Sequence, residues 1–257
     1  MKEGFKDNFS AQSAAYAKFR PRYPDALFEF LASLCATREL AWDCATGNGQ
    51  CAVPLAKFFK SVIASDASEK QLGNAEPNPR VEYRLAAAEN SGLTDHSIDL
   101  ITVAQALHWF KIEQFWNEAY RVLRPNAVIA VWCYSFVQIA PEIDEIVNRF
   151  YSETVGPYWD FERKLVEEGY RSVSFPFNQM KAPVFAIETT WSLPHLIGYL
   201  QSWSATQKYI ARNQHDPTEP VAEELAVVWG APARERAVKW PIHLRVGRPE
   251  SNIPENS

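Results

Sequence analysis

An acidic, glycine-rich segment at residues 41–50 carries the residue types best suited to bind a nucleoside. It reads Ala-Trp-Asp-Cys-Ala-Thr-Gly-Asn-Gly-Gln, and its apolar start predicts a buried strand that ends near Asp43. Gly47 and Gly49 let the backbone turn sharply and let a ligand approach without a Cβ in its way. A helix is predicted from Cys51, and the free N–H groups at its start would face the ligand.

A second acid, Asp66, stands where the next strand of a β-α-β unit would end. It closes the apolar run at residues 62–66 and lies seventeen residues beyond Gly49. A carboxylate at this place commonly accepts hydrogen bonds from ribose hydroxyls, although Asp66 would also serve as a helix cap. Asp43 argues against a dinucleotide, because a carboxylate before the glycines repels a pyrophosphate. It suits a ligand with amino and hydroxyl donors instead.

Alternating strands and helices would position these residues. Apolar runs predict strands at 40–44, 61–65, 81–85, 98–103, 127–134, 185–190 and 240–246. Helical periodicity predicts helices at 8–19, 26–36, 51–59, 69–74, 112–123, 141–151, 193–202 and 219–229. This order predicts an α/β fold whose open, mainly parallel sheet is covered by helices on both faces and connected by right-handed crossovers.

The pattern changes after Phe136, which suggests three parts of the chain. Residues 1–136 would hold N-terminal helices and a cofactor-binding core. Residues 137–230 would form a lid and acceptor region partly integrated with the sheet, and within them 156–179 are aromatic and irregular. Residues 231–257 would supply the final strand and a flexible tail.

From about Phe9 to Phe136 the chain resembles the class I S-adenosylmethionine-dependent methyltransferases. The segment that starts at Asp43 is similar to their D-x-G-x-G-x-G loop, with Ala45 in place of the first glycine. Alanine fits there if its φ is negative. Asp66 matches the family's ribose-binding acid. Ala87-Ala88-Glu89 resembles the segment beside the adenine, with Ala87 in place of the usual aspartate.

Two further segments narrow the resemblance to the type 11, trans-aconitate methyltransferase-like subgroup. One is the N-terminal signature at residues 9–10 and 16–24, and the other is Gln105-Ala106-Leu107-His108-Trp109-Phe110 after the fourth strand. The resemblance implies a Rossmann-like methyltransferase fold with a seven-stranded sheet and an inserted lid. It also implies methyl transfer to a small organic molecule, with a carboxylate that becomes a methyl ester as one candidate.

The resemblance further implies S-adenosyl-L-methionine as the cofactor. The residues expected around it are Tyr16, Arg20, Asp43, Ala45, Gly47, Gly49, Asp66, Ala67, Gln71, Ala88, Glu89 and Gln105. Arg20 would share a helix face with Tyr16 and pair with the cofactor's carboxylate or an acidic acceptor, unless it is a plain surface arginine. Asp43 would bind the cofactor's amino group or only brace the turn. Glu89 more often caps or braces than binds.

His108 and Trp109 are the candidate catalytic residues. Methyl transfer from a sulfonium depends mainly on alignment and on exclusion of water, and it needs a base only for a protonated acceptor. His108 follows the fourth strand at the ligand-binding edge, and its ordinary pKa would let it act as a base. Alternatively it positions the acceptor or orders the loop. Trp109 could wall the site, since aromatic faces attract cations, or pack in the core as expected for Phe110.

Aromatic residues in the second half of the chain hint at an apolar or planar acceptor, although each one alone fits the core better. They are Tyr158, Trp159, Trp191, Trp203 and Tyr209. His195 and Arg212 are weaker polar candidates without a spacing argument.

Bulk properties exclude several functional classes. A length of 257 residues with 47% hydrophobic residues is enough for a full core. The net charge of −5 with no long basic run disfavours nucleic acid as a partner. The four cysteines lack metal-ligand spacing, so no metal site is expected. No apolar run reaches the roughly 20 residues of a membrane helix, and no signal segment is evident, so we expect a cytoplasmic protein of undetermined oligomeric state.

Two other functions fit parts of the pattern. A non-catalytic binding protein could keep the methyltransferase fold, and Ala87 is the one departure that favours it. A nicotinamide-dependent oxidoreductase would fit the glycine pattern and Asp66. Asp43 and the lack of a Tyr-x-x-x-Lys pair after the fourth strand oppose that reading.

Overall fold

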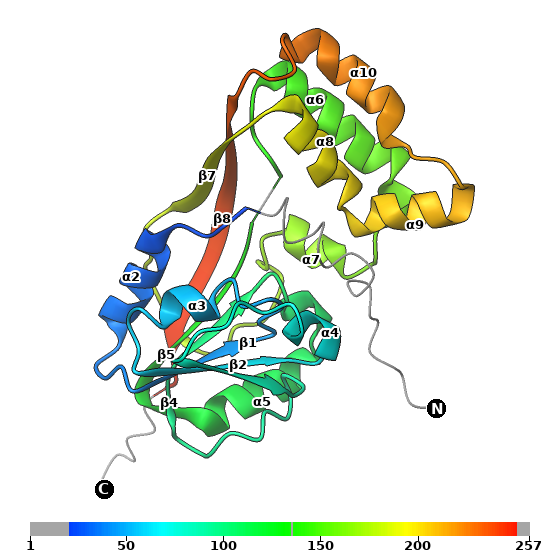
Figure 1. Ribbon diagram of the computed structural model, residues 1–257. Helices are drawn as coiled ribbons and strands as arrows, with labels where there is room; N and C mark the ends of the chain where they lie inside the picture. Colours follow the sequence, from blue (N-terminus) through cyan, green and yellow to red (C-terminus); the bar gives the residue numbers. More distant parts are fainter. Residues whose placement is uncertain (1–20, 135, 251–257) are drawn as a thin grey trace, which may run out of the picture.

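The computed structural model describes residues 21–134 and 136–250. The predicted helix at 8–19, which holds Tyr16, and Arg20 directly after it lie outside these residues. Eight strands form one sheet in the order β3-β2-β1-β4-β5-β8-β6, and β7 also pairs with β8 (Figure 1). The strands are β1 (Leu40–Cys44), β2 (Ser61–Asp66), β3 (Val81–Leu85), β4 (Ile98–Ala104), β5 (Leu123–Tyr134), β6 (Asn178–Met180), β7 (Phe185–Trp191) and β8 (Arg236–Arg248).

The first five strands are parallel, and β6, β7 and β8 join the sheet antiparallel. The α/β architecture is therefore confirmed, but the expected seven strands are eight. The additional strand is β6, which lies at the end of the stretch expected to be irregular and pairs with residues 246–248 of β8. It finds a partner there because β8 spans 13 residues and not only the expected 240–246. One edge of β8 pairs with β5. Its other edge pairs with β6 near Arg248 and with β7 from Arg236 to Ile242.

The helices of the described residues lie where strand connections need them, with some differences from the prediction. They are α2 (Asp25–Leu34), α3 (Ala52–Leu55), α4 (Glu69–Leu72), α5 (Ile112–Val122), α6 (Pro141–Arg149), α7 (Arg163–Glu167), α8 (Leu193–Gln201), α9 (Ser204–Asn213) and α10 (Thr218–Trp229). The helix expected at 51–59 is short, because the bonds from Lys57 N to Pro54 O and from Phe58 N to Leu55 O tighten its end into turns. The prediction missed α7 and α9.

Both faces of the sheet are buried, as expected for parallel strands between helix layers. Along β5, Ala130 and Trp132 face the core cluster that includes α2. Their neighbours Val131 and Cys133 face the cluster that includes α5. The near-continuous apolar sequence of β5 follows from this double burial.

A group of helices, α6, α8, α9 and α10, lies at the far end of the long β7–β8 pair, away from α5 and β1 (Figure 1). The chain leaves the sheet after β5 and enters α6, whose buried Ile143, Ile146 and Val147 hold it in the core. A π-helical turn, η2 (Phe150–Thr154), follows directly. No helix of the described residues is long and apolar enough to cross a membrane.

The strand order reverses beside β1. The chain runs from β1 outward to β2 and β3 and then returns to place β4 on the other side of β1. Loops that leave β1 and β4 at such a reversal diverge, and this is where open α/β sheets commonly bind their ligands. Asp43 on β1 lies level with Thr102 on β4 and Ala64 on β2, so the predicted site residues meet at this edge.

Candidate functional site

Asp43 is fixed beneath the loop that follows β1. Its side chain is 1% exposed. Oδ2 accepts a hydrogen bond from Thr46 Oγ1 at 2.5 Å, and Oδ1 accepts one from Thr102 Oγ1 at 2.8 Å. Burial raises the pKa of this carboxyl to about 6. These contacts favour the bracing role of Asp43 over direct contact with a cofactor.

The loop itself turns through left-handed backbone conformations. Ala45 has φ +56°, Gly47 +59° and Gly49 +90°. Ala45 thus lacks the negative φ under which an alanine fits without strain, and the chain bends there where Thr46 N donates to Ser65 O on β2 at 2.9 Å. A left-handed alanine is strained by about 1–2 kcal/mol. At Gly49 a Cβ would collide with the Tyr83 side chain, so glycine is required there on two grounds.

Asp66 joins this loop to the start of α4. Its Oδ2 accepts from Gly47 N and its Oδ1 from Ser68 N, both at 2.8 Å. The carboxylate therefore braces the turn, and it stays at the edge of the sheet where a ribose would lie.

Gly47, Asp66 and Gln71 lie together above the loop. A Cβ placed on Gly47 would meet Gln71 Oε1 at 4.0 Å, which is ordinary van der Waals contact, as its nearest neighbour. Gly47 N is bonded to Asp66, and the exposed Ala67 follows directly. The oxygens of Asp66 and Gln71 accept hydrogen bonds, as the hydroxyl groups of S-adenosylmethionine require.

In the segment expected beside the adenine, Ala87-Ala88-Glu89, the glutamate has a structural role. Glu89 Oε1 accepts from Lys111 N at 2.7 Å, just before α5, so its side chain braces the start of that helix. Ala88 is 8% exposed. A cofactor contact from this segment therefore remains a prediction.

Gln105 follows β4 in a strained conformation, with φ +54°. Its backbone N donates to Trp132 O at 2.9 Å. Its side-chain Oε1 is buried and has no hydrogen-bond partner among the described residues. A buried acceptor without a donor is costly, and strain of this kind gathers at functional sites. Gln105 is thus suited to accept from a bound ammonium or hydroxyl group.

His108 lies in the 3₁₀ turn η1 (Leu107–Trp109) and is 9% exposed. Its Nδ1 is 2.9 Å from the Tyr170 hydroxyl, and its ring centroid is 4.7 Å from that of Trp109. Burial, together with the charge of Arg163, lowers the pKa of His108 to about 3. The imidazole is therefore neutral at physiological pH, and it is a poor general base.

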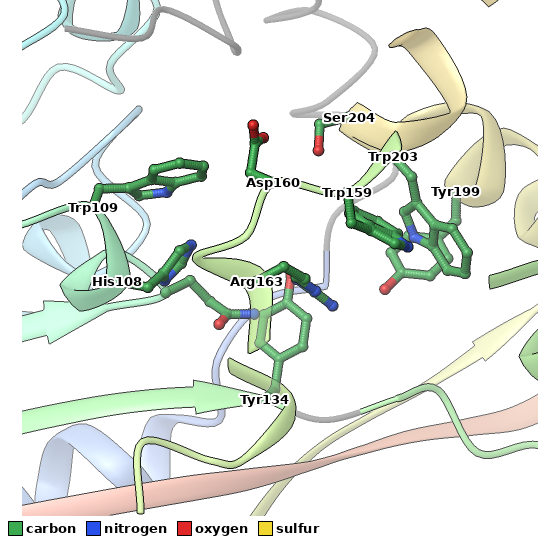
Figure 2. Close-up of a pocket in the computed structure, with 10 residues that line it drawn as sticks. His108, Trp109, Tyr134, Trp159, Asp160, Arg163, Tyr199, Trp203 and Ser204 are labelled. Atoms are coloured by element: carbon green, nitrogen blue, oxygen red, sulfur yellow. The ribbon is translucent and has the colours of Figure 1, made fainter. Parts of the chain in front are cut away.

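A pocket opens beside η1, between the sheet edge and the C-terminal helices (Figure 2). The residues that line it are Gln105, His108, Trp109, Tyr134, Trp159, Asp160, Arg163, Tyr199, Trp203 and Ser204. His108 and Trp109 lie on one side and the aromatic group of Trp159, Trp203 and Tyr199 on the other (Figure 2). Aromatic rings form much of the wall, and polar and charged side chains that could orient a ligand share it.

Arg163 is the main charged group of this wall that the sequence analysis missed. Its Cζ lies 4.9 Å from the ring centroid of Trp159 and 5.7 Å from that of Tyr151. Arg163 Nε donates to the Tyr151 hydroxyl at 3.1 Å. Nearby, Asp160 pairs with Lys208 at 2.5 Å. No sequence signal indicates Arg163, because it stands in an irregular aromatic segment.

The other candidates divide between pocket and core. Gln105, His108, Trp109, Trp159 and Trp203 line the pocket, although each of the two tryptophans from the second half of the chain was expected rather in the core. Their roles toward a cofactor or an acceptor stay predictions. Phe110 packs against Phe115, with ring centroids 4.9 Å apart, as expected of a core residue.

Trp191, Tyr158, Tyr209, His195 and Arg212 do not line the pocket. Trp191 is buried against the rings of His195 and Trp240. Tyr158 and Tyr209 contact each other, with ring centroids 5.1 Å apart.

Comparison with known proteins agrees with this geometry. Residues 42–131 match the family model described as a methyltransferase domain. A Dictyostelium discoideum protein named as a methyltransferase is 39% identical over 225 residues, which cover 86% of each chain. A Saccharomyces cerevisiae protein named as an S-adenosylmethionine-dependent methyltransferase, CRG1, is 28% identical over 65% of this chain and 59% of that protein.

A solved structure described as a type II methyltransferase from Anaeromyxobacter dehalogenans is also similar. It is 43% identical, covers 90% of this chain and 98% of its own, and has a TM-score of 0.84. The similarity therefore extends beyond the parallel strands into the C-terminal half of the chain.

Proposed function

Because this chain belongs to the S-adenosylmethionine-dependent methyltransferases, we propose that its methyl acceptor is a small organic acid held by Arg163. The acceptor's carboxylate would be methylated to an ester or would serve as the handle that orients another nucleophile. The observation that carries the proposal is the guanidinium of Arg163, stacked 4.9 Å from the centre of Trp159 within the pocket.

S-adenosylmethionine, the cofactor of the family, supplies a methyl group activated by its sulfonium. Gly47, Asp66, Ala67, Gln71 and Gln105 are the residues we assign to hold it. Asp66 and Gln71 would accept from its hydroxyls, and the buried Oε1 of Gln105 would accept from its amino group. Ala88 stays a candidate neighbour of its adenine.

The protein's own contribution to the reaction is alignment and exclusion of water. An arginine fork fits a carboxylate in two-point geometry, and the aromatic wall of Trp159 and Trp203 suits a planar or apolar body. The neutral His108 and the ring of Trp109 close the opposite side of the pocket. A carboxylate is already ionised at neutral pH, so the low pKa of His108 is no obstacle to its methylation.

A small molecule is a better candidate for the methyl acceptor than a nucleic acid. The net charge of −5 and the predominantly aromatic wall give no track for a phosphate backbone. Trp159, Arg163 and Trp203, which we assign to the acceptor, all come from residues 137–230. This is the segment that the sequence predicts as the lid and acceptor region.

The test is a turnover screen of the purified protein with S-adenosylmethionine, in which S-adenosylhomocysteine is quantified. The panel holds aliphatic and aromatic carboxylic acids, each paired with its primary amide, together with phenols and amines. We expect turnover with acids and at least tenfold less with the matched amides. Equal turnover of acids and amides, or turnover of amines alone, would contradict the proposal.

A further inference from the structure

We propose that Tyr170 is a positioning residue that holds His108 in the neutral form with its proton on Nε2. His108 then serves the acceptor as a hydrogen-bond donor and not as a base. The role toward the acceptor rests on the proposed function, whereas the tautomer itself does not.

Tyr170 is placed rigidly for this task. It follows α7, and Gly169 and Tyr170 both have left-handed backbone, with φ +61° and +58°. Tyr170 N donates to Leu165 O at 2.8 Å, and Arg245 Nη1 donates to Tyr170 O at 2.9 Å. The side chain is fully buried. A left-handed non-glycine residue beside a candidate site indicates that the position of its side chain matters.

The hydrogen bonds open to the Tyr170 hydroxyl decide which nitrogen of the His108 ring carries the proton. The first N–H groups of a helical turn have no partner within the turn. In η1 these belong to Leu107 and His108, and both lie close enough to the Tyr170 hydroxyl to lower its pKa, against the larger rise that burial causes. A phenol oxygen has two acceptor sites and one proton to donate. The Tyr170 side chain is fully buried, and among the described residues its hydroxyl has His108 Nδ1, 2.9 Å away, as its hydrogen-bond partner. If Nδ1 carried the ring proton, the buried phenol proton would have no acceptor there, which is costly. The phenol therefore donates its hydrogen bond to Nδ1.

The environment keeps the ring uncharged. The charged and titratable groups that share this region are Arg163, Asp160, Tyr170 and Cys133, and Arg163 places its positive charge against the imidazole. Burial disfavours the cation further. A neutral imidazole whose Nδ1 accepts a hydrogen bond carries its own proton on Nε2. His108 also lines the pocket, so this N–H is the group it offers a ligand.

The donors of this pocket limit the chemical class of methyl acceptor that it can bind. Two donors, His108 Nε2 and the Arg163 guanidinium, belong to the same pocket. They favour an acceptor that carries hydrogen-bond accepting oxygens and that ionises before it binds. An alcohol, whose proton must be removed during the reaction, would find no base in His108.

The test is nitrogen NMR of the ligand-free, full-length protein labelled with ¹⁵N-histidine, between pH 5 and 8. The protein has five histidines, and the signal that disappears in His108→Gln assigns the ring. We expect one neutral form with an unprotonated Nδ1 and a protonated Nε2 at every pH. In Tyr170→Phe we expect loss of this single form and a mixture of both tautomers.

Tyr120→Phe is the matched control, because the Tyr120 hydroxyl bonds to Pro176 O and not to η1. It should leave the His108 signals unchanged. A proton on Nδ1 in the wild type, a cationic ring above pH 5, or an unchanged tautomer in Tyr170→Phe would each overturn the proposal. If Tyr170→Phe does not fold, the wild-type spectrum still decides the protonation state. Since no turnover is measured, failure of the acceptor screen leaves this result unaffected.

Discussion

Gly47 N donates a hydrogen bond of 2.8 Å to Asp66 Oδ2, which ties the turn after β1 to the acid that ends β2. The two residues are nineteen positions apart in the chain, yet they form one unit at the carboxyl edge of the sheet. The same carboxylate receives Ser68 N on its other oxygen. A substitution of Asp66 should therefore disturb the conformation of the loop and weaken the binding of a cofactor beside it.

Asp66→Asn should weaken binding of S-adenosylhomocysteine about 10- to 100-fold. The amide keeps one acceptor oxygen but loses the charge, and hydrogen bonds to charged groups contribute roughly 1.5–3 kcal/mol. Calorimetry on the purified protein measures this. Ser68→Ala is the control, because it removes only the cap of α4, a 3.4 Å bond from Gln71 N to Ser68 Oγ. Equal losses in both variants would show that Asp66 acts only through α4.

Ala45→Gly should stabilise the protein by about 1 kcal/mol, because it relieves the strain of an alanine at φ +56°. For a domain of this size, that corresponds to a rise in melting temperature of roughly 2–4 °C. Ala211→Gly is the control, and it should change the stability in the opposite direction. Ala211 is exposed within α9, where glycine should destabilise by about 1 kcal/mol. A lower melting temperature in both variants would contradict the strain at Ala45.

Asp43 should make the folded state less stable as pH rises from about 4 to above 6. Its folded pKa is raised from 3.8 to about 6, so between these values the folded state holds a proton that the unfolded chain has lost. Stability is then fully present below the unfolded pKa and falls as pH passes the folded pKa. The difference is on the order of 3 kcal/mol.

Urea unfolding at pH 4 to 7 of the wild type and of Asp43→Asn measures this effect. The amide does not ionise. One threonine hydroxyl can keep donating to its oxygen, and the other can rotate to accept from its NH2 group. The free energy of unfolding of the wild type should therefore fall relative to the variant across this pH range. If the difference in the free energy of unfolding between the two proteins did not change with pH, ionisation of Asp43 would not destabilise the folded state, and the prediction would be wrong.

Arg163→Met should raise the KM for a carboxylate acceptor about 10- to 100-fold while the affinity for S-adenosylhomocysteine stays unchanged. Methionine keeps much of the packing against Trp159 but not the charge. Arg212→Met is the control, since Arg212 is exposed on α9 and does not line the pocket. Equal kinetics in Arg163→Met and the wild type would remove Arg163 from acceptor binding.

His108→Leu should lower the rate with the same acceptor about tenfold or more, whereas His108→Gln should recover most of it. The glutamine amide reaches close to the position of Nε2 and can donate, but it cannot act as a base. The wild-type rate should show no ionisation of His108 near neutrality, since its pKa is lowered to about 3. Equal loss in both variants, with a rate that follows a group near pH 6 to 7, would restore the role of base.

Local sequence patterns determined the positions of β1 to β4 and the residues at the ends of these strands. Apolar runs and glycine turns are short-range signals, and parallel strands bring their carboxyl ends to one edge. The loop of Asp43 and Gly47, the acid Asp66 and the turn with His108 could therefore be placed together in advance. The conformation of Ala45 could not, because its φ depends on the bond from Thr46 N to Ser65 O on another strand.

Only the tertiary structure decided how the pocket is completed. Tyr170 lies 62 residues from His108, and Arg163 and Trp203 come from segments without helical or strand periodicity that would reveal their partners. Their positions follow from the packing of the C-terminal helices and of the turn after α7 against the sheet. Burial of His108 then lowers its pKa to about 3, and desolvation of this kind cannot be read from residue type, because it depends on every neighbour in space.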